Sequence, residues 1–186
     1  MKKIMFNDRY GLTKAVLEGR KTMTRRIIPE HISSAYIIEG IPGLNDFTTR
    51  EWFRMKGRYK PGEVVAVAQK YKDIPNPFYG RATDWSDASG WENKMFVRAD
   101  LMPHQIRITN VRVERLQDIS DEDCRKEGID YVGGYSESYY FGHGVENIRL
   151  GNSYREAFAA LIDKVSGKGT WASNPWVFVC EFELVK

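Results

Sequence analysis

The densest chemistry in the sequence lies between Gly19 and Arg26, directly behind a glycine. This basic stretch has no carboxylate and holds four cationic side chains and two threonine hydroxyls: Arg20, Lys21, Thr22, Thr24, Arg25 and Arg26. The two threonines stand two positions apart, so on a strand they share one face. Arginine offers a planar fork, lysine a point charge and threonine a short neutral donor to phosphate oxygens. The stretch therefore predicts an anion-binding surface.

A structural interpretation of the same residues stays open. Edge strands often carry charged side chains that prevent aggregation, and threonine is favoured in strands by propensity alone. Charge runs of this kind are common in proteins. The spacing by itself therefore does not decide between a binding surface and a solvated edge strand.

The distribution of charge favours binding near the N-terminus. The formal net charge of +3 over 186 residues is too small to identify a nucleic-acid-binding protein. Residues 1–30, however, hold eight Lys or Arg against three Asp or Glu, a local balance of +5. A local field steers a polyanion more effectively than total charge does. We therefore expect any polyanionic partner to approach this end of the chain.

Several classes of protein are disfavoured. Cys124 and Cys180 are the only cysteines and lie in no metal-ligand or C-x-x-C pattern, and Gly142-His-Gly144 lacks the third glycine of a dinucleotide motif. We expect no disulfide framework, no metal and no cofactor. No apolar run is long enough for a membrane span, and the apolar run near the N-terminus is too short for the core of a signal peptide. The sequence predicts a reduced, cytoplasmic protein without a membrane partner.

The elements that position the basic stretch follow from periodicity. Asn7 and Asp8 are placed to cap a helix that ends at Gly19, after which the basic stretch alternates like a strand. The clearest later elements are a buried strand at 64–67, a long strand at 105–116 with a slip at Asn110, a capped helix from 153 to 167 and an apolar strand at 177–185.

This order predicts one α+β domain over residues 1–186, a small mixed barrel of roughly five to seven strands flanked by about three helices. Three stretches rich in glycine, proline or aromatic residues interrupt the pattern, at about 30–58, 72–93 and 130–151. The first is expected to hold no more than one helical turn. The other two are expected to be long loops, so all three are predicted to be insertions.

Three segments together resemble the ASCH domain family of the PUA-like superfamily, and most closely its larger phage and prophage members. The segments are Gly19–Thr24, Val111–Ile119 and Asn174–Phe182. The resemblance implies a PUA-like small β-barrel whose cleft binds RNA, single-stranded nucleic acid or a modified nucleotide. The expected binding residues are Arg20, Lys21, Thr22, Thr24, Arg25, Arg26 and Arg107.

An enzymatic branch of the same family implies an alternative. Its members are small bacterial amidohydrolases that deacetylate acetylcytidine with a lysine base, a threonine nucleophile and a glutamate on a strand. The first two fall on Lys21 and Thr24, which would cooperate only if Lys21 precedes the strand and has a lowered pKa. The glutamate aligns with Arg107, and a second expected glutamate is replaced by Gln69. These departures favour binding over hydrolysis.

A third hypothesis belongs to another class. The aromatic stretches at 72–93 and 130–150 would suit an accessory phage protein that binds a host protein. The sequence offers no motif that ranks this hypothesis against the other two.

Overall fold

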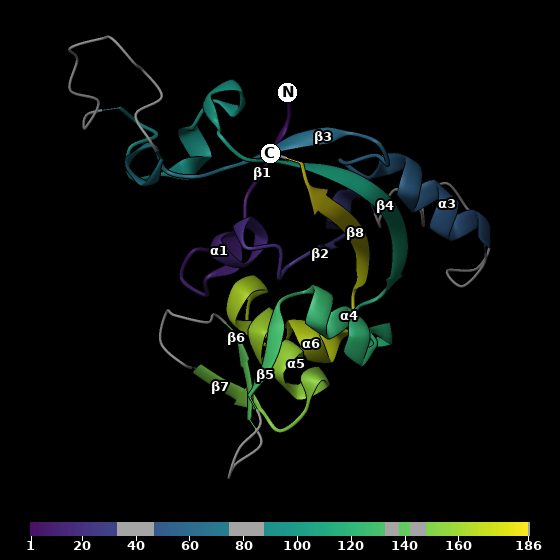
Figure 1. The fold of residues 1–186 in the computed structure, drawn as a ribbon. Helices are drawn as coiled ribbons and strands as arrows, with labels where there is room; N and C mark the ends of the chain where they lie inside the picture. The colour runs from purple at the N-terminus through teal and green to yellow at the C-terminus, as the bar shows by residue number, and fades with distance from the viewer. Residues whose placement is uncertain (33–46, 75–87, 133–137, 142–147, 186) are drawn as a thin grey trace.

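The computed structural model describes residues 1–32, 47–74, 88–132, 138–141 and 148–185 (Figure 1). Its helices and strands in chain order are β1 (Lys3–Ile4), α1 (Leu12–Leu17), β2 (Met23–Ile27), α3 (Phe47–Lys56), β3 (Val64–Val67), β4 (Gln105–Arg115), α4 (Asp121–Lys126), β5 (Ile129–Val132), β6 (Ser138–Phe141), β7 (Ile148–Gly151), α5 (Tyr154–Ser166), α6 (Thr170–Ser173) and β8 (Trp176–Leu184).

Two sheets organise these elements. The larger sheet has five strands in the order β1-β3-β4-β8-β2, in which only the β1–β3 pair is parallel. The smaller sheet, β5-β6-β7, is antiparallel and packs against α5. The predicted α+β class is confirmed. The eight strands and five α-helices named above exceed the numbers that the sequence predicted.

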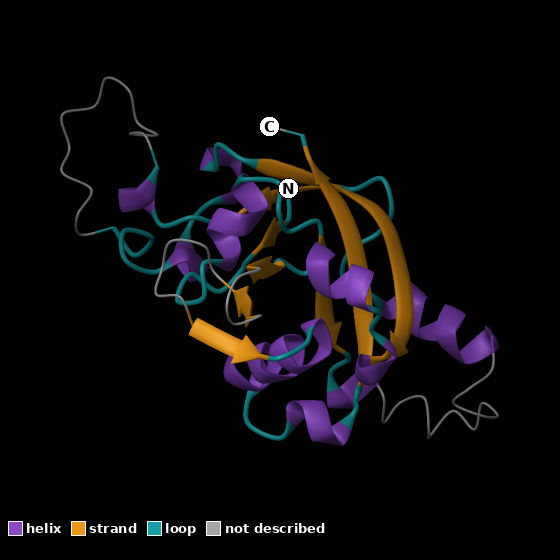
Figure 2. Ribbon diagram, turned by 60° about the horizontal axis from the view of Figure 1, so that its bottom comes forward, coloured by secondary structure: helices purple, strands orange, loops and turns teal. Residues whose placement is uncertain are grey.

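The two longest strands, β4 and β8, form the centre of the larger sheet and run side by side (Figure 2). Both faces of β8 are buried: Phe178, Cys180 and Phe182 point to one side, and Val177 and Val179 point to the other. The predicted slip in β4 is confirmed, because its register against β8 shifts between Ile108 and Asn110. Consecutive side chains of β8 are therefore buried on opposite faces of the sheet.

The α3 helix corrects the prediction for residues 30–58. Its ten residues exceed the single helical turn expected there. Phe53 is fully buried in the core, with its ring centroid 6.2 Å from that of Trp176. The helix lies beside β4 (Figure 1). Phe53 thus anchors α3 to the core, while Met55, Lys56 and Arg58 stay exposed.

The start of α1 is also corrected. Gly11, in a left-handed conformation with φ of 66°, precedes the helix, and no side chain caps it. Asn7 accepts a hydrogen bond from the backbone of Arg9 instead. The helix stop at Gly19 is confirmed, since its φ of 72° is one that other residues adopt at a cost.

The described parts of the other two predicted loops differ from each other. The stretch from 130 to 151 contains strands β5, β6 and β7, so the prediction of an irregular loop is wrong there. Most of the aromatic stretch from 72 to 93 lies outside the described residues.

The α5 helix starts as predicted, with the Ser153 hydroxyl accepting from the Glu156 N–H. Within the described ranges, no helix is both long and apolar enough to cross a membrane.

Candidate functional site

Lys21 is buried in an ion pair. It lies just before β2, and its side chain is 2% exposed. Its Nζ donates to the carboxylate of Glu127 at 2.5 Å and to the carbonyl of the same residue at 2.8 Å. Burial lowers the pKa of the Lys21 ammonium, and the Glu127 charge opposes that shift. The lysine charge is therefore already compensated inside the protein.

The local chain explains how Glu127 reaches Lys21. The α4 helix ends at Lys126, and Gly128 takes a φ of 95° that redirects the chain. The backbone N–H of Thr22 donates to the carbonyl of Lys126 at 2.9 Å. This bond holds the end of α4 against the start of β2.

Arg25 is enclosed by three acidic side chains, one of which is Glu127, the partner of Lys21. Its guanidinium donates to Glu114 and to Asp123, each at 2.6 Å, and to Glu127 at 3.2 Å. It also lies over the Phe158 ring, 5.8 Å from the centroid. With a side chain 1% exposed and three acidic partners, its charge is compensated inside the protein.

Arg112 extends this cluster to β8, where it pairs with Glu181. It pairs with Glu114 at 2.9 Å, with Asp123 at 2.5 Å and with Glu181. We call the resulting set the buried ion network: Lys21, Arg25, Arg112, Glu114, Asp123, Glu127 and Glu181. Its three cations face four carboxylates, so the network neutralises Lys21 and Arg25, two of the cations that the sequence assigned to anion binding.

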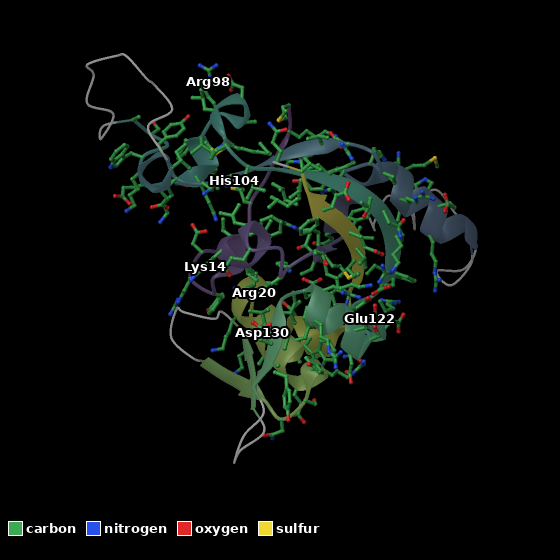
Figure 3. All side chains as sticks on the ribbon, in the orientation of Figure 1. Lys14, Arg20, Arg98, His104, Glu122 and Asp130 are labelled. Carbon is green, nitrogen blue, oxygen red and sulfur yellow. The ribbon has the colours of Figure 1, made fainter. Side chains whose placement is uncertain are left out.

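Two further predicted cations pair with acids on the surface. Arg20 bonds Glu18 at 2.6 Å and Asp130 at 3.1 Å, and Figure 3 labels it beside Asp130. Arg107 is half-exposed and pairs with Glu183 at 3.1 Å. The structure therefore does not join Arg107 and Lys21 in one hollow, because each has its own carboxylate.

The remaining predicted residues lie on the face of β2 opposite Arg25. Thr22 precedes the strand, and its carbonyl accepts from the Phe182 N–H at 2.9 Å. Thr24 is 6% exposed and lines a hollow of about 270 Å³ along β2. Alternation along the strand thus separates Thr24 and Arg26 from the buried ion network.

Arg26 lies in a different electrostatic setting from Arg25. One Nη donates to the Met5 carbonyl at 2.6 Å, and the guanidinium lies 5.7 Å from the centroid of the Phe6 ring. Its Nε is buried and has no hydrogen-bond partner among the described residues. Leaving such a donor unsatisfied is costly, so an external acceptor would be favoured there.

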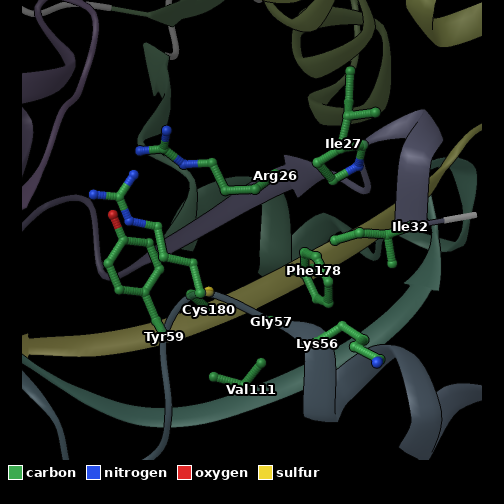
Figure 4. Close-up of a pocket in the computed structure, with 11 residues that line it drawn as sticks. Arg26, Ile27, Ile32, Lys56, Gly57, Tyr59, Val111, Phe178 and Cys180 are labelled. Atoms are coloured by element: carbon green, nitrogen blue, oxygen red, sulfur yellow. The ribbon is translucent and has the colours of Figure 1, made fainter.

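Arg26 contributes to a cavity of about 190 Å³ that we call the Arg26 cavity. Its lining residues are Arg26, Ile27, Pro29, Ile32, Lys56, Gly57, Arg58, Tyr59, Val111, Phe178 and Cys180. Three of them are cationic and none is a carboxylate. Figure 4 shows Arg26 extending toward the hydroxyl end of Tyr59, with Phe178 and Lys56 farther along the cavity.

Sequence reasoning missed Lys56, Arg58 and Tyr59. Lys56 is the last residue of α3, and Arg58 lies two residues later, both inside the stretch 30–58 interpreted as an insertion; Tyr59 comes next in the chain. Lys56 lies 5.0 Å from the Trp52 ring centroid, and Arg58 lies 5.6 Å from that of Tyr59. The run Lys56-Gly-Arg-Tyr59 was a usable signal, because it combines two cations, a glycine and an aromatic residue.

Gln69 lies outside this cavity, and neither cysteine of the chain is a reactive thiol. Gln69 lines a separate hollow near α1, and its Oε1 lies 2.7 Å from His104 Nδ1. Burial raises the pKa of the Cys180 thiol to about 11 and that of Cys124 to about 12, so neither is a ready nucleophile. Within the described ranges, no cluster of His, Cys, Asp or Glu suits a metal ion.

The comparisons with known proteins give no external support for a function. No protein-family model, curated protein or solved structure matches the chain. Membership of the ASCH family therefore stays a prediction from the sequence.

Proposed function

We propose that the protein binds single-stranded nucleic acid, with RNA as the expected form, or a nucleotide at the Arg26 cavity. One observation carries this proposal. Three cationic side chains, Arg26, Lys56 and Arg58, line a cavity to which no carboxylate of the described residues contributes. The binding surface thus differs from the one the sequence predicted, and Arg26 is the predicted residue that lines this cavity.

The chemistry of the cavity suits a phosphate joined to a flat ring. The partnerless Nε of Arg26 is a buried donor that a phosphate oxygen would satisfy. Tyr59 and Phe178 supply aromatic surface on which a base can stack, a contact that tolerates any sequence. Burial raises the pKa of the Tyr59 hydroxyl, so this side chain stays neutral beside the cations.

A PUA-like barrel of the ASCH type is part of the same proposal. It is supported by the approach of the two edges of the larger sheet. The chain that follows β1 is tied to β2 through the bond from Arg26 to the Met5 carbonyl. The cavity would then lie over β2, β8 and β4, on the face of the sheet that carries Val111, Phe178 and Cys180.

Arg26→Gln is expected to weaken binding of a labelled oligoribonucleotide about fivefold at about 0.1 M monovalent salt. The slope of log K against log salt should fall by about 0.7, because one phosphate contact is removed from a single strand. Fluorescence anisotropy over a salt series measures both quantities.

The matched control is Arg98→Gln. Arg98 is exposed and pairs with Asp100 at 2.5 Å, so the same charge is removed away from the cavity. Equal losses in the two variants would mean that only the net charge matters. Absence of binding by the wild-type protein at low salt would exclude the proposed function.

A second candidate function is hydrolysis of an acylated nucleoside, and a specific observation favours it. The expected glutamate aligns with Arg107, yet a carboxylate does meet Lys21, from Glu127 at the end of α4. Lys21 also precedes β2, as the alternative required. Thr24 lines a hollow on the face of β2 opposite Arg25, so it does not share the network in which Lys21 and Glu127 lie.

Incubation with acetylcytidine, followed by chromatography for cytidine, tests this candidate. If it holds, Thr24→Ala should reduce turnover at least a hundredfold, since a nucleophile or its activation is lost. Thr22→Ala, which removes the other threonine of the basic stretch just before β2, is the control. Turnover that survives Thr24→Ala would exclude a mechanism with this nucleophile.

A further inference from the structure

We propose that a second surface, formed by Arg115, Arg125 and Arg155, binds the phosphate backbone of the nucleic acid strand that occupies the Arg26 cavity. This inference rests on the proposed function. We call this patch the stacked arginine surface, because each of its arginines lies over an aromatic ring. The guanidinium carbons of Arg115, Arg125 and Arg155 lie 4.4, 4.7 and 5.2 Å from the ring centroids of Trp176, Tyr154 and Trp171, respectively.

The charges of this surface are not compensated as those of the buried ion network are. Arg115 donates to the carbonyl of Asn174 at 3.2 Å. Arg155 donates to the carbonyls of Ile119 at 3.0 Å and Gln117 at 2.5 Å. Within the described part of the chain, none of the three arginines forms an ion pair, whereas Arg25 and Arg112 each form three.

Two nearby carboxylates are directed to backbone groups. Asp163 accepts from the N–H groups of Gly169 and Trp171, which lowers its pKa. Asp118 accepts from the backbone N–H of Arg115 at 3.4 Å. The guanidinium charges therefore stay available to an external anion.

Hydrogen bonds hold the pieces of this surface together. The Gln117 side chain donates to the Trp171 carbonyl at 2.8 Å, and its backbone N–H donates to the Asn174 side chain at 2.8 Å. These bonds join the end of β4 to α6 and to the start of β8. A guanidinium fixed in this way loses little side-chain entropy when it binds a phosphate.

A buried donor at this surface also lacks a partner. The indole N–H of Trp176, whose ring lies beneath Arg115, has no hydrogen-bond partner among the described residues. A phosphate oxygen at Arg115 is of the chemical type that would satisfy it. This second unsatisfied donor parallels the Nε of Arg26 in the cavity.

The strand β8 connects the two surfaces. Trp176 and Phe178 are two residues apart, so they lie on the same face, and Phe178 lines the Arg26 cavity. The backbone of Ile28, next to the lining residue Ile27, donates to the Trp176 carbonyl at 3.0 Å. The two surfaces are therefore adjacent along β8, with Phe178 at the cavity and Trp176 beneath Arg115.

The test compares a long and a short ligand. The double variant Arg115→Gln/Arg155→Gln is titrated with a labelled oligoribonucleotide of about ten nucleotides and, separately, with nucleoside monophosphates. At about 0.1 M salt, oligonucleotide affinity should fall about fivefold for each arginine removed, and the salt slope should fall by about 0.7 for each. Binding of the monophosphates, which occupy only the cavity, should not change.

Control variants separate charge from folding. Arg115→Lys/Arg155→Lys keeps the charge and should retain most of the salt slope, which a purely structural role would not predict. Arg98→Gln should leave the slope nearly unchanged. Arg125→Gln removes an exposed cation that lies over the Tyr154 ring, and this variant replaces the double variant in the test if the double variant fails to fold. Thermal unfolding of each variant checks the fold.

The outcomes distinguish this inference from the proposed function. If the arginine variants bind the oligonucleotide normally while Arg26→Gln weakens it, the stacked arginine surface is overturned and the cavity stands. If monophosphate binding falls as much as oligonucleotide binding, the surface is not a separate site, and the inference is again overturned. If the wild-type protein binds neither ligand, the proposed function fails and this inference fails with it.

Discussion

Arg25→Met should lower the free energy of unfolding by about 3–5 kcal/mol, because removing one partner of a buried ion pair leaves uncompensated charge. The guanidinium is 1% exposed and holds Glu114, Asp123 and Glu127 together. For a chain of this size such a loss corresponds to a decrease in Tm of roughly 10 °C. Urea unfolding followed by circular dichroism measures it.

The control for this prediction is Arg98→Met, which breaks an exposed pair with Asp100. Exposed pairs contribute about 0–1 kcal/mol, so this variant should unfold almost like the wild type. A similarly small effect for Arg25→Met would show that the buried ion network does not stabilise the fold. Arg25 would then be free for another role.

Lys21→Met should destabilise the protein by a similar amount, about 3–5 kcal/mol, because it leaves the buried carboxylate of Glu127 with one cation fewer. Lys21→Met/Glu127→Met should cost less than Lys21→Met alone. The second substitution removes the uncompensated charge, and Arg25 keeps Glu114 and Asp123. Urea unfolding of the two single variants and the double variant completes the thermodynamic cycle.

Strict additivity in that cycle would contradict the account. It would mean that Lys21 and Glu127 do not interact, although Nζ and the carboxylate lie 2.5 Å apart. A fully folded Lys21→Met variant would also serve the amidohydrolase hypothesis, because loss of turnover could then be assigned to the base and not to unfolding.

The sequence interpretation of the basic stretch was correct only in part. Alternation along β2 was readable, and the strand does separate Arg25 from Thr24 and Arg26. The sequence did not show which face would meet acids. The carboxylates at Arg25 come from Glu114, Asp123 and Glu127, about a hundred residues away along the chain, so a run without local acids looked uncompensated.

Elements with strong local signals were predicted well. The capping serine and the terminating glycine bounded α5, and the alternation in β4 located the shift near Asn110. The α3 helix was missed because Trp52 and Phe53 are scattered among charged residues, and Phe53 is buried by tertiary packing against Trp176. The Arg26 cavity was missed for the same reason, since its lining residues Lys56 and Arg58 lie at the end of that helix and just after it.

The most direct test of the central claim is a crystal structure of the protein with a short oligoribonucleotide. The account predicts a phosphate within hydrogen-bond distance of the Arg26 Nε, with an adjacent base against Tyr59 or Phe178. A phosphate bound instead at Lys21 and Arg25, with the buried ion network opened, would contradict it.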